Sequence, residues 1–170
     1  MSEKNPKYIL DTSLFTQAKR SYYAFDIAPS FWEHIINLAN KNVIASIDKV
    51  YWEIEKGKDD LFDWIKDSLG RDSFISTTTS PNMLLQYQKI IRWSNVNQQF
   101  TDNAKKEFAK FEEADAWLIA QAMENSSTIV SQEVFDQHIR RKIPIPNVCR
   151  EFNLKHIDTF TFLRECGFSM

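Results

Sequence analysis

Carboxylates placed just after expected strands are the residues of this chain that point most directly to chemistry. Asp11 follows the apolar run YIL at residues 8–10, and a short apolar run bounded by polar residues is typical of a buried strand in a parallel sheet. Glu133 comes shortly after a second such run, TIV at 128–130, with the Ser131 hydroxyl close by. Ligands of open α/β sheets bind at the carboxyl ends of the strands, so the two acids are expected at one edge.

Asp115 is a third candidate acid, in the first turn of a helix expected at residues 113–125. Leu118, Ile119 and Ala122 follow it at helical spacing, which puts the carboxylate on the edge of a buried stripe. An unpaired charge in such a place is costly unless helix amides, a cation or water satisfy it.

Helix capping is the alternative explanation for these acids. Asp11, followed by Thr12 and Ser13, could cap the next helix, because all three side chains accept hydrogen bonds from free backbone N–H groups. Asp115 could act only on the helix dipole, and Glu133 alone is an ordinary loop acid. The residues by themselves leave both explanations open.

If the acids converge, a divalent cation is the expected partner. Crowded carboxylates repel one another, so their pKa values rise unless a cation neutralises them. Mg²⁺ or Mn²⁺ suits such oxygen ligands, and a metal held in this way can activate water for attack on a phosphate ester.

The helix expected at residues 47–57, IDKVYWEIEKG, carries two further glutamates beside its apolar stripe. Its apolar stripe leaves Glu53 on one side and Glu55 on the other. Periodicity does not choose between these two glutamates.

The composition describes one ordered domain of 170 residues, with 43% hydrophobic residues and three glycines. A formal net charge of −2 gives no overall positive field for nucleic acid. Arg140, Arg141 and Lys142 form the one basic run. It is either a solvated face or a local site for RNA phosphates.

Cysteine and N-terminal features favour a cytoplasmic protein. Cys149 and Cys166 are too few for a disulfide framework, so reduced thiols are expected. The start, MSEKNPK, does not read as a signal peptide, and no run approaches the roughly 20 apolar residues of a membrane span. The three histidines lack the spacing of a zinc site; they are His34, His138 and His156.

Strand and helix patterns alternate along the whole chain, which predicts a three-layer α/β/α domain over residues 1–170 with a central parallel sheet of four to five strands. After the first strand, further strands are expected at 43–46, 74–76, 128–131 and 156–157. Helices are expected to begin near Thr16, Pro29 and Pro81, and to cover residues 47–57, 60–70, 101–111, 113–125, 147–153 and 159–166.

The order of short motifs resembles the PIN-domain ribonucleases. The motifs are DTS after the first strand, an acid after VYW, ADAWLIA at the start of a helix, and IVSQE. The tail, with KIPIPNVC and HIDTFTFLRE, is similar to a prokaryotic PIN-like subfamily, and the likeness covers nearly the whole chain.

This resemblance implies a set of site residues. The four catalytic acids would be Asp11, Glu53, Asp115 and Glu133, with Asp11, Asp115 and Glu133 as the metal ligands and Thr12, Ser13 and Ser131 in support. Glu53 is preferred to Glu55 because the family's acid stands before an aliphatic residue, here Ile54. The chain departs from the family pattern in having Glu133 where Asp is commoner and Ser131 where Thr is commoner.

The implied activity is hydrolysis of RNA phosphodiester bonds with Mg²⁺ or Mn²⁺. The resemblance also implies the toxin of a toxin–antitoxin pair, a small antitoxin partner and a homodimer. A PIN-fold module that binds RNA or protein without cutting is the alternative. Phosphotransfer through an aspartyl phosphate at Asp11 is disfavoured, because Ser13 stands where such enzymes have a second Asp.

Overall fold

Five short parallel strands form the centre of the computed structural model, which describes residues 5–170. They are β1 (Tyr8–Leu10), β2 (Ile44–Ile47), β3 (Phe74–Ile75), β4 (Thr128–Val130) and β5 (His156–Ile157). The strand order is β3-β2-β1-β4-β5, and every neighbouring pair is parallel. The chain therefore runs outward from β1 on one side and returns to β4 on the other. This places a topological switch point between β1 and β4, where open α/β sheets bind their ligands.

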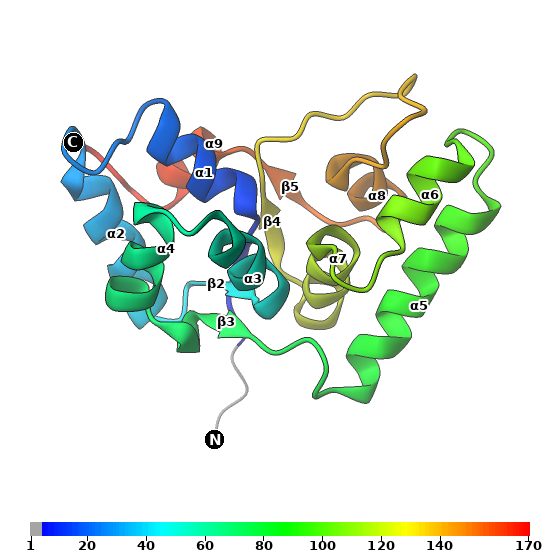
Figure 1. The fold of residues 1–170 in the computed structure, drawn as a ribbon, viewed down its shortest axis with the longest axis horizontal. Helices are drawn as coiled ribbons and strands as arrows, with labels where there is room; N and C mark the ends of the chain where they lie inside the picture. Colours follow the sequence, from blue (N-terminus) through cyan, green and yellow to red (C-terminus); the bar gives the residue numbers. More distant parts are fainter. Residues whose placement is uncertain (1–4) are drawn as a thin grey trace.

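Helices cover the sheet on both faces (Figure 1). One group includes α1 (Thr12–Arg20), α2 (Pro29–Asn40) and α9 (Thr159–Glu165), and the other includes α5 (Pro81–Val96), α7 (Ala114–Asn125) and α8 (Ile145–Glu151). The remaining helical elements are α3 (Asp48–Gly57), α4 (Asp60–Trp64), a π-helical turn (Ile65–Leu69), a 3-10 turn (Arg71–Ser73) and α6 (Asp102–Phe108). This is the expected three-layer arrangement of helices on both faces of a parallel sheet.

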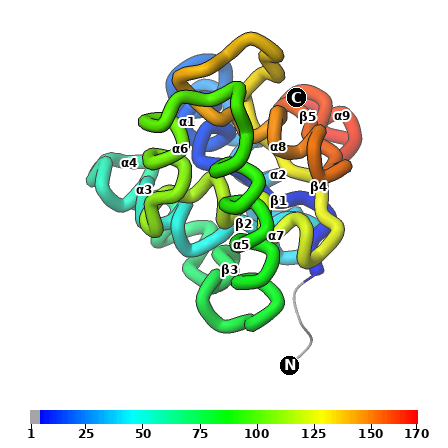
Figure 2. Tube along the Cα trace, turned by 90° about the vertical axis from the view of Figure 1, so that its right-hand side faces the viewer, coloured from blue at the N-terminus to red at the C-terminus, as the bar shows by residue number. Residues whose placement is uncertain are grey.

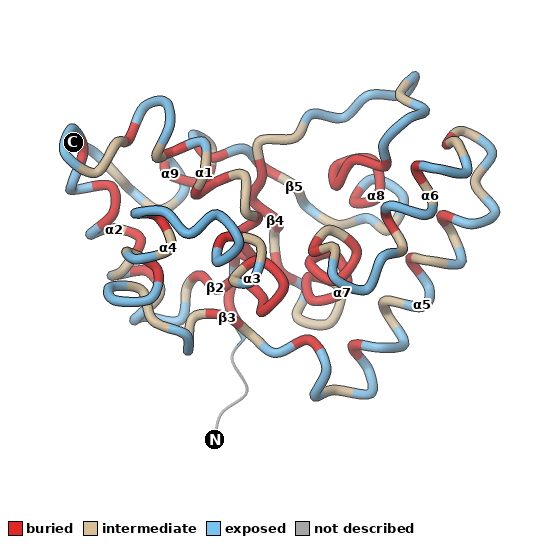
Figure 3. The backbone as a smooth tube through the Cα atoms, in the orientation of Figure 1, coloured by how far each residue is buried: buried red, intermediate tan, exposed pale blue. Residues whose placement is uncertain are grey.

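The core is continuous from the strands into α7, as the red segments of Figure 3 show. All residues of β1 and β2 are buried, which explains their nearly unbroken apolar sequences. The predicted stripe on α7 is buried, but so are Ala116, Trp117 and Ala120. The reason is that α5 packs along the side of α7 that faces away from the sheet (Figures 1 and 2).

Several helix ends differ from expectation because caps set them. The first helix begins at Thr12 rather than near Thr16, since Asp11 accepts a hydrogen bond from the Ser13 amide. The helix expected at 101–111 ends at Phe108, and the one expected at 147–153 begins at Ile145, just after Pro144. The helix expected at 60–70 is α4 followed by the π-helical turn, and Gly70 ends it with a φ of 86°.

The expectation of a chain start without a signal peptide falls partly on residues 1–4, which lie outside the described residues. Within residues 5–170, no helix combines the length and the apolar character needed to cross a membrane.

Candidate active site

Asp11 lies at the carboxyl end of β1 and is 5% exposed. Its carboxylate accepts hydrogen bonds from the Ser13 hydroxyl at 2.7 Å and from the Ser13 amide at 3.4 Å. Burial raises the pKa of Asp11, the Ser13 hydrogen bond opposes the rise, and the charge of Glu133 adds to it. Asp11 is thus a helix cap and also a carboxylate with an acidic neighbour.

Ser13 connects the ends of the two central strands. Its hydroxyl donates to Asp11 and accepts from the Gln132 amide at 3.0 Å, just beyond β4. The Asp11 amide also donates to the Val130 carbonyl at 3.0 Å. These contacts fix the Asp11 carboxylate relative to the loop that carries Glu133.

Glu53 lies on the side of α3 that faces α1, and the Thr12 hydroxyl donates a short hydrogen bond to its carboxylate. Glu55 is exposed. Burial raises the pKa of Glu53, the Thr12 hydrogen bond opposes this, and the charges of Asp11 and Glu113 raise it further. Geometry therefore distinguishes the two glutamates that periodicity left equivalent.

Asp115 lies in the first turn of α7 and is partly buried. Within residues 5–170, no hydrogen bond or ion pair reaches its carboxylate. Its pKa is raised well above the usual range, first by burial and then by the charges of Asp11 and Glu133, with Glu53 adding to the effect and Lys142 opposing it. Asp115 is the acid on which the charges of the other three converge.

Glu133 uses both carboxylate oxygens in local contacts. Oε1 accepts from the Lys142 ammonium at 2.5 Å, and Oε2 accepts from the Ile145 amide at 2.6 Å, at the start of α8. Burial acts to lower the pKa of Lys142, but the bond to Glu133 and the charges of Asp115 and Asp11 raise it overall. Lys142 therefore places a positive charge beside three of the four acids.

Ser131 and His156 form a pair that the sequence did not reveal. The Ser131 hydroxyl and His156 Nε2 share a hydrogen bond at 2.7 Å, and the Glu133 amide donates to the same hydroxyl at 3.3 Å. His156 was set aside because it lacks zinc spacing, yet β5 pairs with β4 and brings the ring beside Ser131. Ser131 supports the loop that carries Glu133.

The acids suit a hard divalent cation in chemistry, although they are not gathered as a ready-made cage. Within the described chain, no three His, Cys, Asp or Glu side chains are grouped closely enough to hold a metal ion. The donor set is nevertheless composed of carboxylate oxygens, and Asp115 has no hydrogen-bond partner among residues 5–170 that a cation would need to displace. The charges of Asp11 and Glu133 raise the pKa of Asp115, and the charge of Glu133 raises that of Asp11. Carboxylate oxygens are the ligand type that Mg²⁺ and Mn²⁺ prefer, but Glu133 would have to leave Lys142 before it could bind either ion.

Comparison with known proteins places the chain in a family. Residues 8–170 match the family described as "Domain of unknown function (DUF4411)". The chain belongs to this family. No curated protein matches it.

Two solved structures are similar to this DUF4411 chain. VapBC-1 from nontypeable Haemophilus influenzae is 16% identical with a TM-score of 0.47, over 89% of this chain and 96% of that one. PAE2754 from Pyrobaculum aerophilum is 17% identical with a TM-score of 0.45, over 95% of this chain and 97% of that one. Both identities are far below the level at which an activity transfers between proteins.

The basic run of the DUF4411 chain is only partly at the site. Arg141 and Lys142 line a cavity of about 270 Å³ together with Glu113 and Asp115. Arg140 is exposed and does not line this cavity, and its carbonyl accepts from the Thr101 amide at 2.9 Å.

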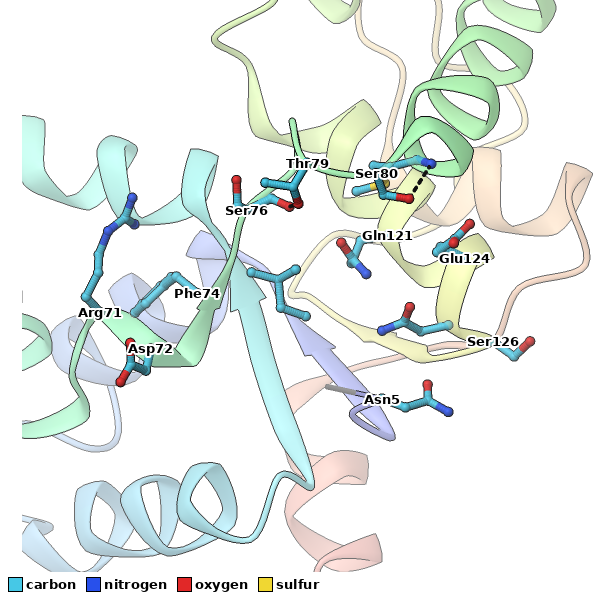
Figure 4. A pocket seen from close by; sticks show the side chains of 13 residues that line it. Asn5, Arg71, Asp72, Phe74, Ser76, Thr79, Ser80, Gln121, Glu124 and Ser126 are labelled. Carbon is cyan, nitrogen blue, oxygen red and sulfur yellow. Dashed lines mark hydrogen bonds between the residues drawn. The ribbon is translucent and has the colours of Figure 1, made fainter. Parts of the chain in front are cut away.

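A larger cavity, of about 960 Å³, lies elsewhere in the DUF4411 chain (Figure 4). It is lined by β3, the start of α5 and the end of α7, with Phe74, Ser80 and Gln121 among its side chains. None of the four acids lines it, so size alone does not locate the candidate site.

Proposed function

We propose that this protein is a divalent-metal-dependent ribonuclease in which Asp11, Glu53, Asp115 and Glu133 are the catalytic acids. One observation supports this most strongly. Carboxylates from β1, α3, α7 and the loop after β4 act on one another electrostatically beside the switch point of the sheet. Carboxylates that acted only as separate helix caps would not be expected to lie close enough to affect one another's pKa values.

Asp11, Asp115 and Glu133 would hold Mg²⁺ or Mn²⁺. The bound ion would supply Lewis acidity and charge neutralisation for phosphodiester hydrolysis. Ser13 holds Asp11 in place, and Thr12 holds Glu53, whose raised pKa suits it to keep or take up a proton during the reaction. Ser131 supports Glu133 through its amide.

RNA phosphates would be bound next to these acids by Arg141 and Lys142, which line the cavity at Asp115, and by the exposed Arg140. A local cation patch is needed because the net charge is −2. The resemblance to PIN domains further supports a cytoplasmic, single-domain toxin with a small antitoxin and a homodimeric state.

A binding module without cleavage is the second candidate function. Both carboxylate oxygens of Glu133 already accept hydrogen bonds, one from Lys142 and one from the Ile145 amide. These contacts favour the binding module, because they make one of the four acids less available to a metal.

Cleavage of a labelled single-stranded RNA in Mn²⁺ or Mg²⁺ tests the proposal. Activity is expected with metal, and EDTA should abolish it. Asp11→Asn and Asp115→Asn should each remove activity and keep the fold, because Asn can also cap α1 at position 11 and Asp115 makes no hydrogen bond among residues 5–170 that would be lost. Cleavage in EDTA, or in both variants, would contradict the mechanism. RNA binding without cleavage by the wild type would favour the binding module.

A further inference from the structure

Lys49, on α3, is fully buried although it is a lysine. Its ammonium has no hydrogen-bond partner among residues 5–170. The adjacent Asp48 carboxylate does not serve this role, because it accepts from the Lys49 amide at 2.8 Å and from the Thr77 amide and hydroxyl at 3.1 and 2.8 Å. A buried cation without a hydrogen-bonded partner is costly. Burial lowers the pKa of Lys49, and the charges of Asp48 and Glu112 act against this effect.

Three aromatic rings surround the Lys49 ammonium. The ring centroids of Phe111, Trp52 and Trp117 lie 3.6, 4.9 and 5.3 Å from Nζ, within the range of cation–π attraction. Trp117 is buried and fixed, since it stacks on Tyr87 at 3.9 Å and donates to the Phe111 carbonyl at 3.1 Å. Phe111 is 58% exposed and Trp52 is 39% exposed. We call Phe111, Trp52 and Trp117 the aromatic cage of Lys49. Trp117 forms its buried side, and Phe111 and Trp52 form the side that faces solvent.

The cage adjoins the candidate active site. Lys49, Trp52 and Glu53 share one face of α3, at positions i, i+3 and i+4. α3 packs against α7, and Phe111 comes shortly before Asp115 in the chain. The charge of Glu113, between them, acts on Glu53. Trp52 and Phe111 therefore belong to the same segments of the chain as Glu53 and Asp115.

Phe111, which covers the Lys49 ammonium, lies in the connection between α6 and α7. It lies between the end of α6 at Phe108 and the start of α7 at Ala114, outside any helix or strand. More than half of the Phe111 surface is exposed, so a rotation of the ring toward solvent would turn it away from its aromatic neighbour Trp117 rather than into the core. Such a rotation would uncover the ammonium, which would then need an anion or water.

We propose that Lys49 is a phosphate-binding residue for single-stranded RNA, covered by Phe111 in the free protein, and that bases stack on Phe111 and Trp52. Exposed aromatic faces beside a cation match the two chemical parts of a single-stranded nucleotide, its base and its phosphate. A duplex keeps its bases inside and offers only the phosphate. The inference rests on the proposed function, since it extends the RNA path away from the acids.

Equilibrium binding of a fluorescent single-stranded RNA, measured in EDTA over a range of salt concentrations, tests this. Lys49→Met fills the same space without charge. It should weaken binding by about tenfold and make the slope of log K against log salt shallower by about 0.7, the loss of one phosphate contact. Lys41→Met, which removes an exposed charge at the end of α2, should change neither.

The variant Trp52→Leu is a second test, in which Lys49 is unchanged. It should weaken binding with an unchanged salt slope, because stacking releases no counterions. Wild-type affinity and slope in Lys49→Met, or an undiminished affinity in Trp52→Leu, would overturn the inference while leaving the ribonuclease proposal intact. Absence of RNA binding by the wild type in EDTA would also overturn the inference, whereas the ribonuclease proposal is decided separately by cleavage in Mn²⁺.

Discussion

Asp115 is the residue whose environment departs most from that of a surface carboxylate. Burial and the charges of Asp11, Glu133 and Glu53 raise its pKa, whereas the charge of Lys142 opposes the rise. The folded protein therefore binds the Asp115 proton more tightly than the unfolded chain does. Ionisation of Asp115 costs folding free energy.

This sign predicts the pH dependence of the Asp115→Asn variant. As pH rises from about 4, where an unperturbed aspartate titrates, the wild type loses stability until pH passes the raised folded pKa. The variant lacks this loss, so in EDTA its melting temperature should exceed that of the wild type increasingly with pH, by about 2–4 °C per kcal/mol. Melting curves in EDTA between about pH 4 and pH 8 would measure this. If the difference in melting temperature between the variant and the wild type did not change with pH, the pKa of Asp115 would not be raised in the folded protein.

Glu53 and Glu55 offer a matched pair on one helix. Glu53→Gln should lower RNA cleavage by about 100-fold or more, because it removes a carboxylate with a raised pKa that is held by Thr12. Glu55→Gln, at an exposed position, should leave the rate within about twofold. Initial rates under saturating Mn²⁺ give the comparison. A larger loss of rate in Glu55→Gln than in Glu53→Gln would show that Glu55, not Glu53, is the acid at the site.

At this scale the sequence predicts the four acids but not their hydrogen-bond partners. An acid after an apolar run is visible in the sequence, because strand ends are local features. The contacts of Glu133 with Lys142 and Ile145 depend on how the loop after β4 folds back. The burial of Lys49 was missed for a similar reason, since its cage joins α3 to a distant aromatic pair.

At the scale of elements, the start of α8 depends on Glu133. Pro144 precedes this seven-residue helix without a side-chain cap, and Glu133 supplies the acceptor for the Ile145 amide from the loop after β4. One side chain thus joins the end of β4 to the start of α8. A metal ion bound by Glu133 would have to compete with this contact to the Ile145 amide.

Two substitutions at Glu133 separate its charge from its capping role. Both Glu133→Gln and Glu133→Ala remove the charge, but only glutamine keeps an oxygen that can accept from the Ile145 amide. Glu133→Ala should therefore be less stable than Glu133→Gln by about 0.5–2 kcal/mol, the usual value of a cap. Urea unfolding measures the difference. Equal stabilities would show that the contact with Ile145 contributes nothing to α8.

Most elements were predictable because their signals are local. Ser80 and Pro81 mark the start of α5, and Gly70 ends the π-helical turn. Errors arose where a side chain served two purposes. Asp11 begins α1 as a cap while facing the other acids, so the helix starts earlier than its apolar pattern suggests.

At the scale of the molecule, the strand order of the sheet positions the candidate site. β1 lies between β2 and β4, and the reversal of direction there gathers acids that are far apart in the sequence. Alternating strands and helices predicted a parallel sheet, but the alternation does not specify strand order. The convergence of Asp11 with Asp115 and Glu133 is a property of this topology.

The measurement that tests the central claim most directly is the effect of Mn²⁺ on melting. A cation bound only by the folded state adds about 2.7 kcal/mol at a hundredfold excess over its dissociation constant. The wild type and the control Glu55→Gln should therefore melt several degrees higher in Mn²⁺ than in EDTA, whereas Asp115→Asn should melt at nearly the same temperature in both. Equal shifts in wild type and Asp115→Asn, or no shift in the wild type, would contradict a shared metal site.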